Sequence, residues 1–484
     1  MAEPELVTGS PLTRNGVDYA WRQLAERSGL APEETRVVSF AYRGIAAGRA
    51  VRPAAASPPT PRVTVVPCRP TAFQSVLEHN TPPLSWLTAD AVVPAGAGLP
   101  IGNSVPVLFW GEGFEDGGRP FAERLTDGSV VFYADIVAAA FFMLSRWEET
   151  VVATRDEHGR FPDTASVAYR LGFIDRPIVD EYALILREWV RLLLPRWKPS
   201  TGRFEVKLSH DIDWLRRTWN LPVLVRSLGA DLLRTRRPRR AVKTFKTLTE
   251  ATAEVAIPQS APRFRAIYEL AKMSLRYGLD SVFYLMAAPP GRFDDGYDLN
   301  SRYCRRCIAR LRRQGFEVGL HASYDSFDSP SMLAVEKQRI EKVLGGKVYG
   351  SRQHRLRFNV PRTWRHLEQI GLQHDSTMSY AEYEGFRCGT CHPFRPFDGE
   401  QDRELSIREV PLVVKDNTLR VCRRLAPAQA EARILELAQR CKCVEGVFTL
   451  LWHNTLLDSD RRDWVATYEQ VLSGLSVLAD ARTK

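Results

Sequence analysis

The sequence lacks an apolar run long enough to cross a lipid bilayer. Its longest apolar stretch, Val130 to Leu144, is interrupted by Asp135, and it is shorter than the ~20 apolar residues that a membrane-spanning helix needs. We therefore expect this stretch to form a buried core helix. The N-terminal residues MAEPELVTGS contain acidic residues and lack the apolar centre of a secretory signal. The expected location is the cytoplasm.

The sequence also lacks internal repeats and a strong excess of one charge. Hydrophobic residues make up 44% and charged residues 26% of the 484 residues, and the formal net charge is +10. This composition is typical of a soluble globular protein, and the length suits two or three domains. The positive charge is spread along the chain, which does not favour a nucleic-acid partner. Only the run Arg234 to Lys246 concentrates it, and this run predicts either a solvated helix face or peripheral contact with an anionic membrane.

Cysteine is too sparse for a disulfide-stapled protein, with eight residues in the chain. In a cytoplasmic protein of this size we expect thiols. Two C-x-x-C pairs occur, Cys304/Cys307 and Cys388/Cys391. The first lies in YCRRCIARLRR, which predicts one helix with both cysteines facing a core. The long separation of the pairs differs from zinc-ribbon spacing, so a four-cysteine zinc site is the less favoured interpretation.

The first part of the chain, residues 1–200, mixes short strand patterns with apolar helix patterns, and no chemistry is evident in it. Residues 52–62 contain four prolines and predict a local linker or an exposed loop. A clear helix is expected over 178–194. We predict a separate mixed α/β N-terminal domain of unknown role at 1–200, with a boundary near Pro195–Gly202.

Beyond residue 202, strand and helix patterns alternate. The helix expected over 333–344 stops at Gly345, a typical C-terminal signal. Alternation predicts a parallel sheet, and polar residues recur where the strands end, as in the active sites of (β/α) barrels. We therefore expect residues 201–484 to form an α/β barrel that is incomplete or distorted. The expected strands are 204–208, 281–285, 316–320, 347–350, 371–373, 407–414 and 447–451.

Two aspartates follow the first of these strands. Asp211 and Asp213 are two positions apart, so in a strand they point to the same face. Neighbouring carboxylates raise each other's proton affinity unless a cation separates them. The pair therefore suits a metal ligand beside a general base, and the alternative is a helix cap or ordinary loop aspartates.

Imidazole ligands are available at the ends of two later strands. His321 and His354, together with Asp213, would form a three-ligand set that suits zinc or a similar divalent ion and leaves a position for water. Asp325, four residues after His321, is the rival third ligand.

Three further residues follow strands and could support proton transfer. Arg352 is always charged and could hold Asp211 ionised and oriented. His453 follows an apolar strand and could transfer a proton near neutral pH. Asp375, in HDSTMSY, is either part of the site or a turn cap. The glycine- and aromatic-rich segment 385–394 is either a substrate-binding lid or a well-packed loop.

The order of these motifs resembles that of the polysaccharide deacetylase family (NodB-homology, carbohydrate esterase type). The resemblance covers roughly residues 203–460 and is closest to a bacterial branch with an extra N-terminal domain. It departs from the family's H-x-x-x-H motif, because Asp325 stands at the second histidine. The matching segments are SHDID (Asp211 and Asp213), HASYD (His321), SRQHRLRF (Arg352), GLQHDSTMSY (Asp375) and LLWHN (His453).

The resemblance implies a distorted (β/α) barrel of about seven strands and metal-dependent removal of an acetyl or other acyl group from an N- or O-acylated sugar or glycan. It implies Asp211 as the base, His453 as the acid, and Arg352 and Asp375 as orienting residues. The ion, most readily Zn²⁺, would be held by Asp213, His321 and His354. Two alternatives stay open: an inactive deacetylase-like glycan-binding protein, and a metal-dependent amidohydrolase acting on a non-sugar amide.

Overall fold

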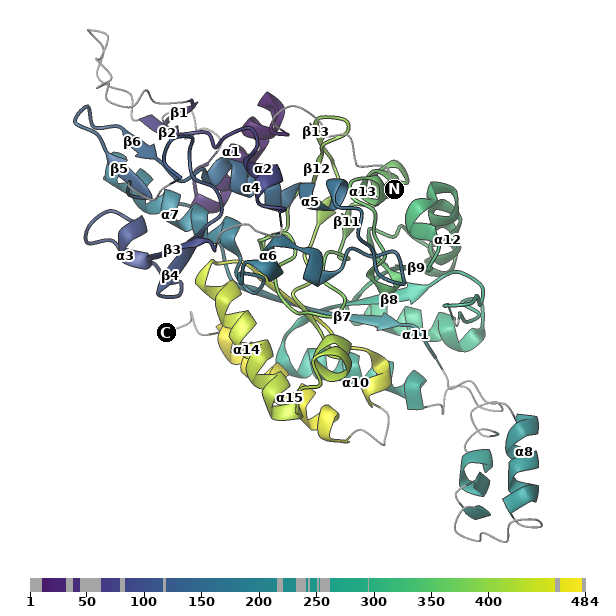
Figure 1. The fold of residues 1–484 in the computed structure, drawn as a ribbon. Coiled ribbons are helices and arrows are strands. Elements are labelled where there is room, and N and C mark those ends of the chain that lie inside the picture. Colours follow the sequence, from purple (N-terminus) through teal and green to yellow (C-terminus); the bar gives the residue numbers. More distant parts are fainter. Residues whose placement is uncertain are drawn as a thin grey trace. The chain divides into compact units, whose positions relative to one another are not determined.

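The computed structural model describes most of the chain as mixed α/β structure (Figure 1). Two compact units emerge, the first formed by 1–205, 355–423 and 436–449 and the second by 206–354, 424–435 and 450–484. Of the basic run 234–246, only 241–242 and 244–246 lie within the described residues, so its arginines lie outside them. Of the proline-rich segment 52–62, only Arg62 is described. The described residues are 11–31, 38–43, 62–78, 83–115, 119–215, 221–231, 241–242, 244–249, 252, 262–294, 296–457 and 462–480.

The first unit begins with short strands and helices and is completed by later segments. Its early elements are α1 (Arg14–Ser28), β1 (Ser39–Tyr42), β2 (Arg62–Val65), α2 (Ala72–Ser75), β3 (Ser85–Thr88), α3 (Ala89–Val92), β4 (Ser104–Val107), β5 (Ala122–Arg124), β6 (Val130–Phe132), α4 (Ile136–Leu144), α5 (Trp147–Val151), α6 (Val167–Arg170) and α7 (Ile178–Leu193). Its later elements are α13 (Arg362–Gln369), β11 (His374–Asp375), β12 (Phe397–Asp398), β13 (Arg403–Glu404), β14 (Arg408–Glu409) and β15 (Val414–Lys415).

The second unit alternates strands with helices. Its elements are β7 (Glu205–Ile212), α8 (Leu221–Gly229), α10 (Pro262–Tyr277), β8 (Asp280–Met286), α11 (Arg302–Arg313), β9 (Glu317–Ala322), α12 (Pro330–Leu344), β10 (Gly350–Gln353) and α15 (Arg462–Asp480). The chain also forms α14 (Pro427–Cys443) and β16 (Val447–Leu451). Helices α11 and α12 both pack against β9, and α10 packs against β8 (Figure 1).

The largest sheet has eight strands in the order β14-β11-β10-β9-β8-β7-β16-β15. The pairs β7–β8, β8–β9 and β9–β10 are parallel, as the alternation of strand and helix patterns predicts. Their register sets Tyr284 beside Asp211 and sets His321 between Met286 and Arg352. A smaller sheet has the order β1-β2-β6-β5. The chain is therefore mixed α/β with a largely parallel main sheet, consistent with the expected barrel-type architecture.

The apolar run from Val130 to Leu144 forms a strand and then a helix. Asp135 separates β6 from α4 and caps the helix, because its carboxylate accepts the backbone N–H of Ala138 at 2.8 Å. Every residue of α4 is buried, as expected for a core helix. Among the described residues, none of the helices has both the length and the apolarity to span a bilayer.

Helix α12 shows how local signals set the helix boundaries in the second unit. Ser329 caps its start and Pro330 occupies the first turn, while Gly345 ends it in the left-handed conformation at φ 63°. The face that packs inward buries Leu333, Ile340 and Leu344, and full burial of each such side chain contributes about 1.5–3 kcal/mol. The predicted end of this helix at Leu344 is confirmed.

Three expected strands differ from the observed ones. The strand expected over 371–373 lies at His374–Asp375 instead. The strand expected over 347–350 starts at Gly350 instead and continues through Gln353, because its buried residues are polar and escape a hydrophobic pattern. The strand expected over 407–414 is reduced to two short pieces, β14 and β15. Pro411 lies between them, and a proline cannot donate a hydrogen bond to a sheet.

Candidate metal centre

The candidate site of the second unit is formed by residues at the ends of β7, β9 and β10. Asp211 lies on β7 and is buried, and Asp213 follows the strand directly with a side chain that is 22% exposed. His321 is buried near the end of β9, and His354 follows β10 immediately. The C-terminal ends of parallel strands lie at one edge of a sheet, which explains how these residues approach one another.

The structure brings together the three residues expected to hold a metal. One donor atom from each of Asp213, His321 and His354 lies within 4.8 Å of the others. Nε2 of His321 is 3.0 Å from Oδ1 of Asp213, and the rings of the two histidines are 5.2 Å apart. Asp325 is exposed at the start of a short helical turn, outside this group.

Both imidazoles are oriented by contacts through their other nitrogen. Nδ1 of His321 is 2.9 Å from the backbone carbonyl of Arg352, and Nδ1 of His354 is 2.6 Å from Oδ1 of Asp294. Metal-ligating histidines are typically fixed in this way, which leaves Nε2 for the ion. One carboxylate and two such imidazoles fit a divalent ion, and they match the donor types of a catalytic zinc site.

Asp211 lies beside this cluster and is held by an ion pair. Nη1 of Arg352 is 3.1 Å from Oδ1 of Asp211 and donates to the hydroxyl of Ser209 at 2.8 Å. The other carboxylate oxygen, Oδ2, is 3.9 Å from Nε2 of His321. Arg352 and Asp211 are both buried, so the guanidinium and the carboxylate compensate each other away from water.

A glycine and an aromatic ring support the guanidinium of Arg352. The charge centre of Arg352 lies 4.7 Å from the ring centroid of Tyr284, a cation–π distance. The ring of Tyr284 in turn occupies the space above Gly319, where a Cβ would come within 2.6 Å of it. Residue 319 therefore has to lack a side chain for Tyr284 to lie under Arg352.

His453 approaches the same cluster after β16. Its Nε2 is 3.8 Å from Oδ2 of Asp213, and the residue is only 8% exposed. Asp213 thus faces His321 through one oxygen and His453 through the other. The structure therefore collects Asp211, Arg352 and His453 around the three expected ligands.

Asp375 belongs to the first unit. It lies on β11, is fully buried, and accepts the backbone N–H of Thr377 at 2.9 Å through Oδ2. Burial and the charge of Asp375 raise the pKa of the neighbouring Glu409 well above its usual value. The contact with Thr377 is that of a turn cap, the second interpretation of the motif, and an orienting role for Asp375 stays a prediction.

In this cluster, burial and the neighbouring charges shift the pKa values of the proposed metal ligands in opposite directions. Burial raises the pKa of Asp213, but contact with His321 and the charges of His354 and His453 outweigh it and hold that pKa well below the usual range. Burial lowers the pKa of His321, but Asp211 and Asp213 outweigh it and raise that pKa. In the absence of a metal, Asp213 therefore stays ionised to a lower pH than an ordinary aspartate, and His321 keeps its proton to a higher pH than an ordinary histidine.

A role for Asp294 was not expected from the sequence, although this residue contacts the proposed metal ligand His354. It lies in the loop after β8, and its two oxygens accept the backbone N–H of Tyr324 at 3.0 and 3.1 Å. The available signal was an acidic pair in the glycine-containing segment FDDG after a strand. The supporting residues Ser209, Tyr284 and Gly319 had no comparable signal, because their roles depend on contacts across strands.

Comparisons with known proteins give distant matches. A family model described as a family of unknown function (DUF7033) matches residues 84–195, and no curated protein matches the chain. Similar solved structures include a protein described as a polysaccharide deacetylase from Mycobacterium smegmatis, with 17% identity, a TM-score of 0.37, and coverage of 59% of this chain and 87% of that one.

Two further structures are similar at lower identity. One is PuuE allantoinase, with 9% identity, a TM-score of 0.35, and coverage of 57% of this chain and 85% of that one. The other is a CE4 family pseudoenzyme from Bacillus anthracis, with 12% identity, a TM-score of 0.26, and coverage of 56% and 63%. None of these matches assigns an activity to this chain, so its chemistry rests on the side chains of the site.

Proposed function

We propose that the second unit is a metal-dependent hydrolase that removes an acetyl or other acyl group from an N- or O-acylated sugar or glycan intermediate. One observation carries this proposal. Three metal-ligand side chains, Asp213, His321 and His354, converge next to a carboxylate, Asp211, that an arginine holds in place. A ligand set with an adjacent base is what metal-assisted hydrolysis of an amide or ester needs.

The three ligands leave room for reactants. Three protein ligands leave at least one coordination position for water or substrate. A divalent ion such as Zn²⁺, held by Asp213, His321 and His354, would supply Lewis-acid activation of the acyl carbonyl and of water. His321 and His354 keep their orientation through Arg352 and Asp294, so the chain fixes the ligands before the ion arrives.

Asp211 is the proposed general base. Its Oδ1 is engaged by Arg352, while Oδ2 lies on the side of His321 at 3.9 Å from Nε2. This oxygen is therefore placed to take a proton from a water molecule at the cluster. Arg352 orients the carboxylate and balances its charge.

His453 is the proposed general acid. Its Nε2 approaches Oδ2 of Asp213 from β16, while Asp211 approaches the cluster from β7. A histidine at this position can protonate the leaving amine or alkoxide as the acyl bond breaks. The resemblance of GLQHDSTMSY to the family motif is the basis for proposing an orienting role for Asp375.

The sugar part of the proposed substrate rests on the order of the sequence motifs from SHDID to LLWHN. We further propose a cytoplasmic protein whose acylated carbohydrate is a precursor or a lipid-linked intermediate, with residues 1–200 as an additional domain. The second candidate function, a non-catalytic glycan-binding protein, would use the same residues without proton transfer. The third is hydrolysis of a non-sugar amide by the same residues.

Acetate release from acetylated oligosaccharides tests the proposal. With Zn²⁺ supplied, Asp211→Asn and His453→Ala should each lose about 10²–10⁴-fold in kcat, while the metal content stays that of the wild type. Asp325→Asn is the matched control, because this aspartate is exposed and outside the cluster, and it should retain full activity.

The other outcomes either contradict the assigned roles or favour one of the two alternative functions. Full activity in both Asp211→Asn and His453→Ala would contradict the assigned roles. Metal-independent binding of glycans without release of acetate would favour the binding protein. Release of a carboxylic acid from simple amides, but not from acetylated sugars, would favour the non-sugar amidohydrolase.

A further inference from the structure

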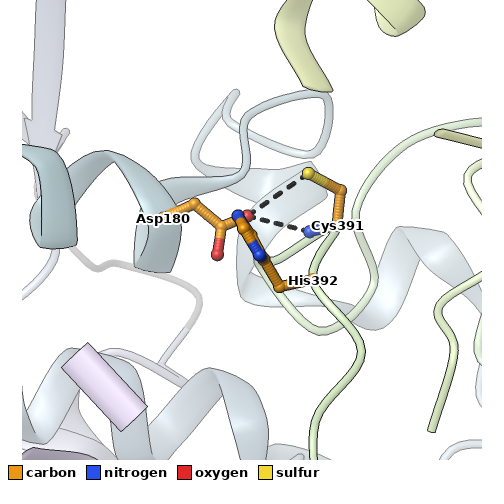
Figure 2. Close-up of side chains that lie close together, drawn as sticks. All are labelled: Asp180, Cys391 and His392. Atoms are coloured by element: carbon orange, nitrogen blue, oxygen red, sulfur yellow. Dashed lines mark hydrogen bonds between the residues drawn. The ribbon is translucent and has the colours of Figure 1, made fainter. Parts of the chain in front are cut away.

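A second cluster of metal-ligand side chains lies inside the first unit and has no part in the proposed hydrolysis. Figure 2 shows Asp180 from the first turn of α7 meeting Cys391 and His392 from a later loop. One donor atom from each residue lies within 4.8 Å of the others. Asp180 and Cys391 are almost completely buried, and His392 is half-buried.

The distance between the Cys391 thiol and the Asp180 carboxylate equals the distance expected between two ligands of one metal ion. Sγ of Cys391 lies 3.5 Å from Oδ2 of Asp180, along the hydrogen bond that the thiol donates. A zinc ion with sulfur at about 2.3 Å and oxygen at about 2.0 Å in tetrahedral geometry holds these two atoms about 3.5 Å apart. An ion could therefore replace the thiol proton with little movement of either side chain.

The carboxylate of Asp180 is positioned by donors that an ion would leave in place. Arg27 donates through Nε at 3.1 Å, Thr390 through its hydroxyl at 2.6 Å, and Cys391 through its backbone N–H at 2.9 Å. Hydrogen bonds of this kind to a ligating carboxylate are the usual outer layer of a metal site. The ion pair with Arg27 also balances the negative charge of this carboxylate in the interior.

His392 and Cys441 complete the set. One ring nitrogen of His392, Nε2, is 2.9 Å from the backbone carbonyl of Val444. This contact fixes the ring and leaves the other nitrogen with its lone pair. Cys441, at the end of α14, is fully buried and its thiol interacts with that of Cys391. It is not one of the three donors that lie within 4.8 Å of one another, so it would have to move toward the ion to bind it. Two thiols, an imidazole and a carboxylate form a donor set that favours zinc.

The backbone approaches the cluster closely at Gly446. A Cβ at this position would come within 2.2 Å of Sγ of Cys391 and 3.3 Å of the His392 ring. The backbone N–H of Gly446 donates to the carbonyl of Cys441 at 2.9 Å, and that of Val447 donates to Cys391 at 3.3 Å. The two cysteines are thus held next to each other by main-chain contacts as well as by their own side chains.

The geometry points to a structural zinc site formed by Cys391, His392 and Asp180, with Cys441 as the fourth ligand. The site binds a thiophilic divalent cation and joins α7, the loop 385–394 and the end of α14. Four protein ligands close the coordination sphere, and the burial of both thiols excludes substrate. The role of this site is therefore to tie three separate segments of the first unit together, independently of the proposed hydrolase.

Metal analysis of the purified full-length protein separates the two sites. The wild type should hold two equivalents of metal, and His321→Ala, which removes the first site, should retain one. In Co²⁺-substituted His321→Ala protein, the near-ultraviolet band of thiolate-to-cobalt charge transfer should appear, because only the second site contains cysteine. Adding Cys391→Ser or His392→Ala to this variant should remove the remaining equivalent. Adding Cys441→Ser should weaken the charge-transfer band or abolish it.

Cys388→Ser is the matched control, since Cys388 is also fully buried in the same loop but is neither one of the three clustered donors nor the proposed fourth ligand. It should keep both the metal and the charge-transfer band. If the cysteine variants do not fold, the spectrum of folded His321→Ala decides alone. Absence of bound metal in that protein, bound cobalt without a thiolate band, or equal loss of the band in Cys388→Ser would each overturn the proposal.

Discussion

The imidazole of His354 contacts the carboxylate of Asp294, with Nδ1 2.6 Å from Oδ1. The same carboxylate accepts the backbone N–H of Tyr324 through both oxygens. Asp294 therefore links the loops after β8 and β9 to the end of β10. A proposed metal ligand thus depends on a residue that holds no metal itself.

We expect Asp294→Ala to weaken metal binding at the centre by about 10–100-fold, as removal of an orienting partner of a histidine ligand typically does. Competition with a chromophoric chelator measures the affinity. Asp325→Ala is the control and should bind as the wild type does. Unchanged affinity in Asp294→Ala would mean that His354 either needs no orientation or is not a ligand.

The residues of the site that follow strands could be predicted from the sequence. Asp211 and Asp213 follow an alternating strand, and His321 and His453 follow apolar ones, so strand ends supplied the signal. His354 was harder to place, because β10 buries Ser351, Arg352 and Gln353 instead of apolar residues. The contacts of Asp294 could not be predicted, because they join three loops that are distant in sequence.

Helix ends were predicted better than helix starts. Gly345 ends α12 where the sequence indicates, but the helix begins at Pro330 and not at the expected Leu333. Helix α7 spans 178–193 against an expected 178–194, although no side-chain cap marks its start. Strand lengths were predicted less well, because Pro411 interrupts one expected strand. Local signals therefore indicate where helices end, whereas pairing between strands depends on distant partners.

The affinity for metal should rise with pH. Asp211 and Asp213 raise the pKa of His321 against the effect of burial, so a metal has to displace a proton from this ligand. Below that pKa the affinity should fall about tenfold for each pH unit, since one proton is released for each ion bound. Titrations of Zn²⁺ affinity between about pH 6 and pH 8 cover the relevant range around the usual histidine pKa.

The Asp211→Asn variant provides the comparison for this titration. Loss of the neighbouring negative charge should lower the pKa of His321 and move the fall in affinity to lower pH. A wild-type affinity that does not change with pH would show that His321 binds no metal or is already deprotonated.

Gly319→Ala should impair catalysis without removing the metal. The added methyl group would come within 2.6 Å of the Tyr284 ring and displace the platform under Arg352. Overpacking of this kind costs about 1–3 kcal/mol of stability, and a misplaced base would lower kcat by up to about 10²-fold. The measurements are acetate release and metal content on the same preparation.

Gly346→Ala is the matched substitution, because its Cβ would lie 3.7 Å from the nearest side chain. This variant should keep its activity. Equal activity of Gly319→Ala and the wild type would contradict the positioning of Asp211 through Arg352 and Tyr284.

Glu149 should stabilise the first unit in a pH-dependent way. Arg387 binds its carboxylate through Nε at 2.8 Å and Nη2 at 2.6 Å, and Arg146 donates at 2.8 Å. Burial raises the pKa of Glu149, but these two arginines outweigh it and hold the pKa at about 2. A lowered carboxyl pKa contributes stability above the unfolded value of about 4.3, and this contribution is lost as the pH falls towards 2.

Glu149→Gln should therefore cost about 3–5 kcal/mol at neutral pH, because it leaves two buried guanidinium groups without their shared carboxylate. Urea unfolding at pH 7 and at pH 3 measures both effects, and the difference between variant and wild type should shrink at the lower pH. Glu188→Gln, which breaks an ion pair with the exposed Arg191, should change stability by less than about 1 kcal/mol. A similar small change in Glu149→Gln would contradict the proposed role.

Arg352 serves two partners through different parts of the residue. Its side chain holds Asp211, and its backbone carbonyl orients His321. A substitution at position 352 alters the first contact and preserves the second, because every amino acid supplies the carbonyl. A substitution of Arg352 would therefore disturb the proposed base Asp211 without removing the backbone contact that orients the proposed metal ligand His321. In the proposed hydrolase, a single change there would impair the base and leave the orientation of a proposed metal ligand intact.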